Sequence, residues 1–242
     1  GWEFSSGARE NRWADGTALP PRVIGSAVEK SEIFTMKGEG MPESRERGIR
    51  DIIREYREKK IEGLFLDLVP YRTDLSPEIV RLRNRERNRH FLAQNEEITP
   101  ESQLAWGERY LLREDDIYWC LFRKEGDFIG TIRLYDIAPD GSSLTQGSFM
   151  IDETRSGEAP YAVEAELLSL DFAFDRLKVQ SVINEDRADN RIMNSLTKRM
   201  GFRFVKDTVI RGASYHYYLL SEEDYRKKRG KAEELLRYWK ER

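Results

Sequence analysis

The sequence predicts an α+β fold with a mixed, mostly antiparallel sheet and helices on both of its faces. Three observations support this prediction. Strand-like runs joined by short turns fill the middle of the chain, helical segments with clear start signals flank them, and a later strand returns after a helix. The 242 residues are 39% hydrophobic and 35% charged, which excludes a disordered chain and allows one large core.

The chain is expected to have three parts. They are an N-terminal arm and helix over residues 1–60, a main domain over residues 61–220, and a C-terminal helix over residues 221–242. The helix of the first part is expected at about 43–60, because its apolar residues repeat at helical spacing. These residues are Ile49, Ile52, Ile53 and Tyr56. The sequence indicates no role for this first part.

Turn and capping signals define the elements of the main domain. Ser76-Pro77-Glu78 and Thr99-Pro100-Glu101 each combine a capping residue, a proline and an acid, so a helix is expected to begin at each. Glu125-Gly126-Asp127 and Asp140-Gly141 are hairpin turns of an antiparallel meander. The expected strands cover 63–71, 117–122, 128–137, 143–151, 179–183, 202–209 and 215–220, and the expected helices cover 76–92, 99–112, 162–177 and 190–200.

Composition disfavours several kinds of partner. The net charge is −3, from 41 basic and 44 acidic residues, so a nucleic-acid partner is disfavoured. One cysteine and two histidines show no metal-ligand spacing, so no metal is expected. No apolar run reaches about 18 residues and no signal peptide is evident, so no membrane partner and a cytoplasmic location are expected. The oligomeric state, including a homodimer, is left open.

The segment from Asp152 to Ala162 is expected to bind an anion. It joins the end of a strand to a helix, and the first turn of such a helix offers free amides and the positive end of a dipole. The strand after this helix is expected to lie parallel to the strand before it, so a cofactor arm could lie where the two separate. A plain strand–helix connection is the alternative, since no P-loop or GxGxxG pattern is present.

Two segments resemble the GCN5-related N-acetyltransferases (the GNAT family), and the resemblance covers about residues 64–220. Asn190 to Phe202 is similar to the family's asparagine-containing helix that ends in Gly-Phe, and Val163 to Phe174 is similar to its cofactor helix. Other segments resemble the acetyltransferases of bacterial amino-sugar pathways, such as those of the pseudaminic-acid type. These segments are Leu82-Arg83-Asn84, residues 95–101, residues 130–137 and residues 149–151.

The resemblance implies transfer of an acetyl group from acetyl-CoA, as co-substrate, to a small-molecule primary amine, with an amino sugar on a nucleotide as the favoured acceptor. A polyamine or protein acceptor is the alternative. Two departures favour a non-catalytic acyl-CoA-binding module of a larger assembly. Pro160, which has no N–H, occupies a glycine slot of the pyrophosphate loop, and Thr197 stands where many members have a tyrosine acid.

The resemblance also implies the residues of the site. The residues expected to bind the cofactor are Phe149, Ile151, Arg155, Gly157, Ala159, Tyr161, Ala162, Asn184 and Asn190. Asn184 could equally be a turn residue, and Asn190 is expected to cap its helix as well as to contact the cofactor. For the chemistry we expect an oxyanion contact at Met150 and a base among Glu97 and Asp136, with Asp152 and His90 open by residue type.

Two further expectations come from the residues themselves. The basic run Arg81, Arg83, Arg85, Arg87 and Arg89 forms either a solvated face or contacts to substrate phosphates. Cys120 lies among aromatic residues and is expected in the core, so acyl transfer should be direct, without an acyl-enzyme.

Overall fold

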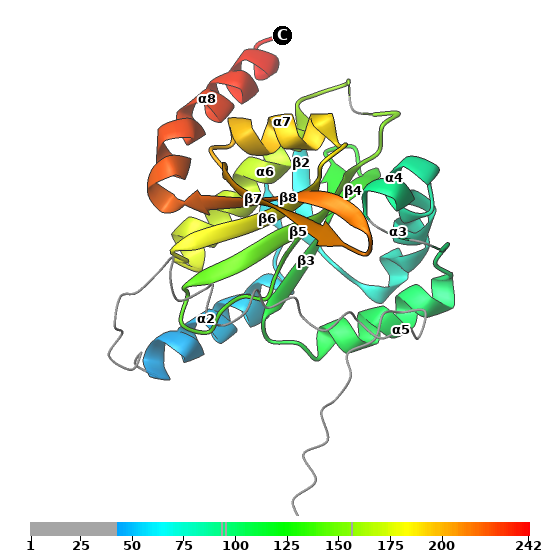
Figure 1. Cartoon of the computed structure of the whole chain (residues 1–242). Coiled ribbons are helices and arrows are strands. Elements are labelled where there is room, and N and C mark those ends of the chain that lie inside the picture. Colours follow the sequence, from blue (N-terminus) through cyan, green and yellow to red (C-terminus); the bar gives the residue numbers. More distant parts are fainter. Residues whose placement is uncertain (1–42, 93, 95, 156) are drawn as a thin grey trace, which may run out of the picture.

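The computed structural model describes residues 43–92, 94, 96–155 and 157–242, and its centre is one sheet (Figure 1). The strands are β1 (Ile61–Glu62), β2 (Leu66–Pro70), β3 (Asp116–Arg123), β4 (Phe128–Tyr135), β5 (Ser143–Ile151), β6 (Ser181–Arg187), β7 (Arg203–Ile210) and β8 (Ala213–Ser221). Their order in the sheet is β1-β2-β3-β4-β5-β6-β8-β7. Only β5 and β6 are parallel neighbours within the described residues, so the mixed, mostly antiparallel sheet is confirmed.

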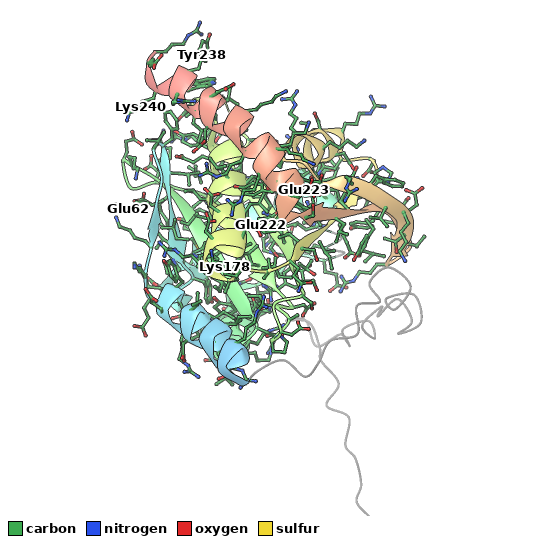
Figure 2. The ribbon with its side chains drawn as sticks, turned by 90° about the vertical axis from the view of Figure 1, so that its left-hand side faces the viewer. Glu62, Lys178, Glu222, Glu223, Tyr238 and Lys240 are labelled. Carbon is green, nitrogen blue, oxygen red and sulfur yellow. The ribbon has the colours of Figure 1, made fainter. Side chains whose placement is uncertain are left out.

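Helices cover both faces of this sheet, as predicted. They are α2 (Glu43–Tyr56), η1 (Thr73–Leu75), α3 (Ser76–Arg83), α4 (Glu86–Phe91), α5 (Pro100–Leu111), α6 (Tyr161–Asp171), η2 (Phe172–Arg176, a π-helical turn), α7 (Arg191–Arg199) and α8 (Glu222–Lys240). Figure 2 shows α2, α6 and α8 along one face, where they share the main hydrophobic cluster. A smaller cluster of Tyr71, Ile79, Tyr110 and Tyr118 joins α3 and α5 to the other face.

The expected strand over 63–71 is present as β2, which begins only at Leu66, because residues 63–65 form the tight turn of a hairpin between β1 and β2. The buried carboxylate of Glu164 on α6 accepts hydrogen bonds from the backbone amides of Leu64, Phe65 (2.9 Å) and Leu66 (3.0 Å), which hold the turn in place. A Cβ atom on Gly63 would lie 2.6 Å from the Leu66 carbonyl oxygen and 2.7 Å from Glu164 Oε1, so glycine is required there. This contact spans 100 residues of sequence, beyond the reach of local patterns.

The expected helix over 76–92 is broken into α3 and α4 at Asn84 and Arg85. The Asn84 amide donates to the Ile98 carbonyl oxygen (2.7 Å), and its oxygen accepts from the Ile98 amide (2.9 Å). The side chain therefore joins the end of α3 to the segment before α5. As predicted, α5 begins at Pro100, and its capping box pairs Thr99 with Ser102.

Two other elements differ from the prediction in their bounds. The strand expected over 179–183 begins at Ser181 and continues to Arg187, so Asn184 lies inside β6 and does not follow it. The helix expected over 162–177 is α6 followed by the π-helical turn η2.

The two terminal parts also pack on the main domain. The expected arm before residue 43 lies outside the described residues. Helix α2 contributes three buried residues to the main cluster: Ile49, Ile53 and Tyr56. Helix α8 contributes Tyr225, Ala232 and Leu236 to the same cluster. The expected boundaries at residues 60 and 220 stay predictions.

Candidate active site

The site begins where β5 and β6 separate. The two strands pair only from Ser143 with Ser181 to Gln146 with Asn184 in the described structure, although β5 continues to Ile151 and β6 to Arg187. A bulge turns β5 away at Ser148, whose φ is +48° and whose carbonyl oxygen accepts the Thr131 hydroxyl (2.7 Å). The β6-facing edge of residues 147–151 is therefore open to hydrogen bonds with an extended ligand.

The loop after β5 leads to the first turn of α6. Pro160 precedes this helix and gives it no side-chain cap, and by helix geometry the amides of Ala162 and Val163 have no acceptor inside the helix. Gly157 has open space around it, and Arg155 pairs with Glu158 (3.1 Å). These amides and the helix dipole can bind a phosphate group.

Ala159 and Tyr161 are placed differently from the other cofactor residues expected in this loop. Both side chains are buried in the main hydrophobic cluster. They could therefore contact a cofactor only through their backbone atoms.

Two alternatives for a base, Asp152 and His90, each have a partner within the protein. Asp152 binds Arg85 through both carboxylate oxygens (2.5 and 2.9 Å) and accepts the Thr154 hydroxyl (2.7 Å). Burial by itself would raise the pKa of Asp152, but these partners outweigh it and lower the pKa to about 2. Asp152 is therefore an anchor of the loop and a poor proton acceptor. His90 lies at the surface against Asp189 (2.7 Å).

The two expected asparagines both have partners inside the protein. The Asn190 side chain accepts from the Met193 amide (3.2 Å) and caps α7. The Asn184 amide donates to the Thr197 hydroxyl (3.2 Å), which in turn donates to Asp186 (2.5 Å). Because its proton is committed to Asp186 and its side chain is buried, Thr197 has no proton to give a leaving thiolate.

Two buried carboxyl groups near Thr197, those of Asp186 and Glu166, were not expected from the sequence. Burial raises the pKa of Asp186 to about 6, and burial together with the charge of Asp186 raises the pKa of Glu166 to about 8. Glu166 Oε2 and Gln146 Oε1 are buried with no hydrogen-bond partner among the described residues. The alternation of side chains along a strand could have indicated the burial of Asp186, because Asp186 points to the same face of β6 as the buried Val182 and Asn184.

Glu185 faces the opposite side of the sheet, and sequence reasoning missed it. It pairs with Tyr217 of β8 and lies just past the last β5–β6 pair. Its side chain is exposed, but partial desolvation by its neighbours and the nearby charge of Asp136 raise the pKa of Glu185. The ring of Tyr135 covers Gly147, where a Cβ atom would lie only 3.1 Å away. A carboxylate beside the separated strands can accept a proton from an amine bound there.

The three expected catalytic residues are not brought together. Glu97 is exposed between α4 and α5 and pairs with Arg89 (3.0 Å). Asp136 follows β4 and pairs with Arg113 (3.2 Å). Met150 is buried on β5, with Phe149 and Ile151 beside it. The described residues show no hydrogen bond between Glu97 and β5, and its role stays a prediction.

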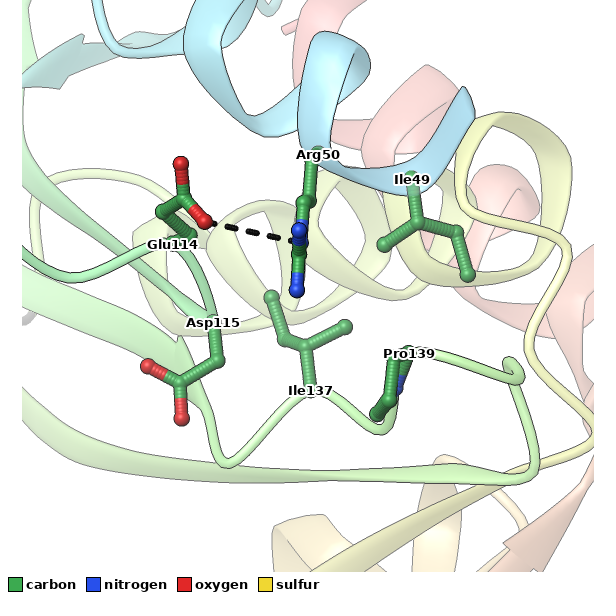
Figure 3. Close-up of a pocket in the computed structure, with 6 residues that line it drawn as sticks. All are labelled: Ile49, Arg50, Glu114, Asp115, Ile137 and Pro139. Atoms are coloured by element: carbon green, nitrogen blue, oxygen red, sulfur yellow. Dashed lines mark ion pairs between the residues drawn. The ribbon is translucent and has the colours of Figure 1, made fainter. Parts of the chain in front are cut away.

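Two hollows on the surface of the described residues lie away from the opening between β5 and β6. Figure 3 shows one beneath α2, where Arg50 pairs with Glu114 (3.5 Å) beside Ile49, Ile137 and Pro139. It lies at the end of the sheet where β4 stops and β5 starts, opposite to the separation of β5 and β6. A second hollow lies on the first turns of α8.

Comparison with known proteins identifies the family. Residues 66–203 match the family model of the acetyltransferase (GNAT) domain, and the chain belongs to this family. A search of curated proteins found no match. In the described part of the chain, no helix has the length and apolar character needed to cross a bilayer, and no group of side chains is suited to hold a metal ion.

Solved structures with the same fold include several acetyltransferases. FdhC, described as a nucleotide-linked sugar GNAT, is 22% identical with a TM-score of 0.63, over 74% of this chain and 98% of that one. A GCN5-related N-acetyltransferase from Brucella melitensis is 20% identical with a TM-score of 0.63, over 74% and 86% of the two chains. Spermidine N-acetyltransferase from Vibrio cholerae, in complex with CoA and spermine, is 14% identical with a TM-score of 0.61, over 66% and 97%.

Proposed function

We propose that this GNAT domain transfers an acetyl group from acetyl-CoA to a primary amine. One observation carries this proposal: β5 and β6 separate beside the first turn of α6. This separation places an open strand edge next to a site that can bind phosphate. The cofactor's extended arm would lie along residues 149–151, and its pyrophosphate at the amides of Ala162 and Val163.

The other proposed cofactor contacts surround this path. Arg155 would supply charge and Gly157 an approach for the phosphates, while Ala159 and Tyr161 would contribute backbone atoms. Asn184 and Asn190 would contact the arm near the ends of β6 and α7. These roles are proposed in addition to the hydrogen bonds that the same side chains make within the protein.

The proposed reaction is a direct attack. The amine, once deprotonated, attacks the thioester carbonyl carbon, the Met150 backbone N–H stabilises the oxyanion, and the CoA thiolate leaves. We propose Glu185 as the proton acceptor ahead of Asp136 and Glu97, because those two carboxylates are paired with arginines. Burial raises the pKa of the Cys120 thiol, which opposes a covalent acyl-enzyme.

The proposed acceptor is an amino sugar linked to a nucleotide, in line with the likeness to a nucleotide-linked sugar GNAT. Two observations favour the second candidate, a module that binds acyl-CoA without catalysis. Pro160 has no amide to give to a phosphate, and the Thr197 hydroxyl is committed to Asp186. Turnover separates the two candidates, since both bind acetyl-CoA.

The test combines binding with turnover. Acetyl-CoA at about 100 times its Kd should stabilise the protein by about 2.7 kcal/mol. Free thiol should then be released with a nucleotide-linked amino sugar, in preference to spermidine or a peptide amine. Arg155→Gln should weaken acetyl-CoA binding, whereas Lys178→Gln, on an exposed residue, should not. Binding without turnover on any of these amines would favour the module, and no binding would refute both candidates.

A further inference from the structure

The basic run on α3 and α4 contains one arginine that differs from the others. Four of the five arginines pair with a carboxylate: Arg81 with Glu78 (2.9 Å), Arg85 with Asp152 (2.5 Å), Arg87 with Glu153 (3.0 Å) and Arg89 with Glu97 (3.0 Å). Arg83 has no carboxylate partner among the described residues, although it is less exposed than a solvated side chain. A guanidinium without a counter-ion in such a place is costly unless a ligand supplies the charge.

Arg83 is held in a fixed orientation. Its Nε donates to Gln94 Oε1 (3.3 Å), and the Gln94 amide donates to Asn84 Oδ1 (3.0 Å) and to the Glu96 carbonyl oxygen (2.8 Å). The two terminal nitrogens of Arg83 meet no carboxylate or carbonyl oxygen among the described residues, and the Tyr118 hydroxyl lies close enough to interact with the guanidinium. The N–H groups of these nitrogens form a planar fork that fits two oxygens of one anion.

The hydroxyl of Tyr118 is a second donor without a partner. Tyr118 is 2% exposed, and its hydroxyl is buried with no hydrogen bond in the described structure. Burial raises the pKa of Tyr118, so the phenol keeps its proton, and the nearby Arg83 charge reduces that shift only in part. Burial also lowers the pKa of Arg83 despite its proximity to Tyr118, as expected for a cation that lacks a counter-ion.

The carboxylate two residues before Tyr118 on β3, Asp116, is already occupied by other arginines. Asp116 is fully buried and binds Arg133 through both oxygens, with Arg133 Nε 2.8 Å from Oδ1, and it also pairs with Arg113 (3.2 Å). Arg133 lies over the Trp106 ring, 5.1 Å from its centre. The Asp116 carboxylate is therefore shared by Arg133 and Arg113, and no ion pair links it to Arg83 in the described structure.

The strand register of the sheet gives the distance from Tyr118 to the opening between β5 and β6, where the acetyl transfer is proposed to occur. Tyr118 pairs with Arg133, and Arg133 pairs with Gly147, the first residue of β5 beyond its pairing with β6. Neighbouring strands are about 4.8 Å apart, so Tyr118 lies two strands, about 10 Å, from the opening between β5 and β6. One small molecule can span that distance.

We propose that the acceptor amine carries an anionic group, a phosphate or a carboxylate, that binds between Arg83 and Tyr118 about 10 Å from the nitrogen that is acetylated. The proposal rests on the proposed function and narrows its substrate class. The guanidinium fork binds two oxygens of the anion and the Tyr118 hydroxyl a third. An acceptor with only cationic groups, such as a polyamine, leaves this charge unpaired and is disfavoured.

The first test measures anion binding on the full chain with the cofactor site filled. Inorganic phosphate and acetate are titrated separately by calorimetry in the presence of saturating CoA, which prevents phosphate from occupying the pyrophosphate site. We expect one of the two anions to bind, and the anion that binds identifies the group. Arg83→Gln should weaken that binding about 10- to 100-fold and Tyr118→Phe about 10-fold, as expected for charge-assisted hydrogen bonds. Arg72→Gln, in an exposed pair with Asp74, should leave it unchanged.

The second test uses turnover. An amino sugar and the same sugar bearing a phosphate are compared as acceptors, and Arg83→Gln should remove the preference for the phosphorylated form through KM. Arg83→Lys keeps the charge without the fork and should restore part of it. Failure of CoA to bind would refute the proposed function, whereas CoA binding without any anion binding would refute the anion site alone. Anion affinities of Tyr118→Phe and Arg83→Gln equal to that of the unmodified protein would also overturn the proposal.

Discussion

Glu166 on α6 and Asp186 on β6 place two buried carboxyl groups on the same side of the sheet, beneath the point where β5 and β6 separate. Both have raised pKa values, and Thr197 donates a hydrogen bond to Asp186. The pair makes the protein's stability depend on pH.

The first prediction concerns that dependence. Burial raises the pKa of Glu166 from its ordinary 4.5 to about 8, so the folded protein holds a proton that the unfolded chain releases near pH 4.5. This contribution is therefore complete below about pH 4.5 and is lost as the pH rises toward 8, by up to about 1.4 kcal/mol per pH unit. Glu166→Gln should flatten this fall in denaturant titrations from pH 5 to 8.5. The exposed Glu234→Gln is the control, and equal slopes in all three proteins would contradict the prediction.

The second prediction concerns the proton acceptor. Glu185→Gln should lower kcat/KM by about 10²- to 10⁴-fold while acetyl-CoA affinity stays the same. Because partial desolvation and the Asp136 charge raise the pKa of Glu185, the rate of the unmodified protein should rise with pH at values above the ordinary range of a glutamate. The variant should lose that pH-dependent rise. Asp136→Asn and Glu97→Gln are the comparisons. A larger loss in either of them than in Glu185→Gln would assign the base to that residue.

The third prediction separates two roles of Asn190. Replacing it with alanine removes the cap of α7, which should cost about 1 kcal/mol of unfolding free energy. Ser221→Ala removes the equivalent cap of α8, where the hydroxyl accepts from the Asp224 amide (3.2 Å), and should cost about the same. Only Asn190→Ala should also weaken acetyl-CoA binding. Equal acetyl-CoA affinities in the two variants would leave Asn190 with the capping role alone.

The fourth prediction concerns the order of bond making. Cys120 is fully buried, and a raised thiol pKa keeps it protonated, so it should never carry the acetyl group. Initial-rate lines with varied acetyl-CoA and amine should intersect, and Cys120→Ser should keep most of its turnover if it folds. Parallel lines, or an acetyl adduct on Cys120 by mass spectrometry, would show a covalent intermediate.

The fifth prediction concerns α2. Ile53 is 2% exposed, and Tyr56 packs edge-on against Phe172 with ring centres 4.7 Å apart. Ile53→Ala should cost about 2–5 kcal/mol, whereas Arg54→Ala, on an exposed side chain, should cost little. A chain that begins at residue 61 should fold but melt at a lower temperature. Complete loss of folding in that chain would make α2 part of the core domain.

Local sequence determined the order of most helices and strands. Capping residues, hairpin glycines and strand alternation act over a few residues, so the starts of α5 and α7 and the β3–β4–β5 meander follow from them directly. The burial of Cys120 and the inward side of α2 follow in the same way. The position of the loop after β5 also follows, because it depends only on a strand that ends and a helix that begins.

Tertiary structure decided which polar groups have partners. The hairpin turn at Leu64 depends on Glu164, and the break after α3 depends on Asn84 binding Ile98, so neither pattern is visible in its own segment. In the sequence, Arg83 is one of five alternating arginines. Folding brings the distant Asp152 and Glu153 to Arg85 and Arg87, and it brings the Tyr118 hydroxyl to Arg83. The physical reason is that charge compensation and burial are set by residues far apart in the chain, whereas caps and turns are set by neighbours.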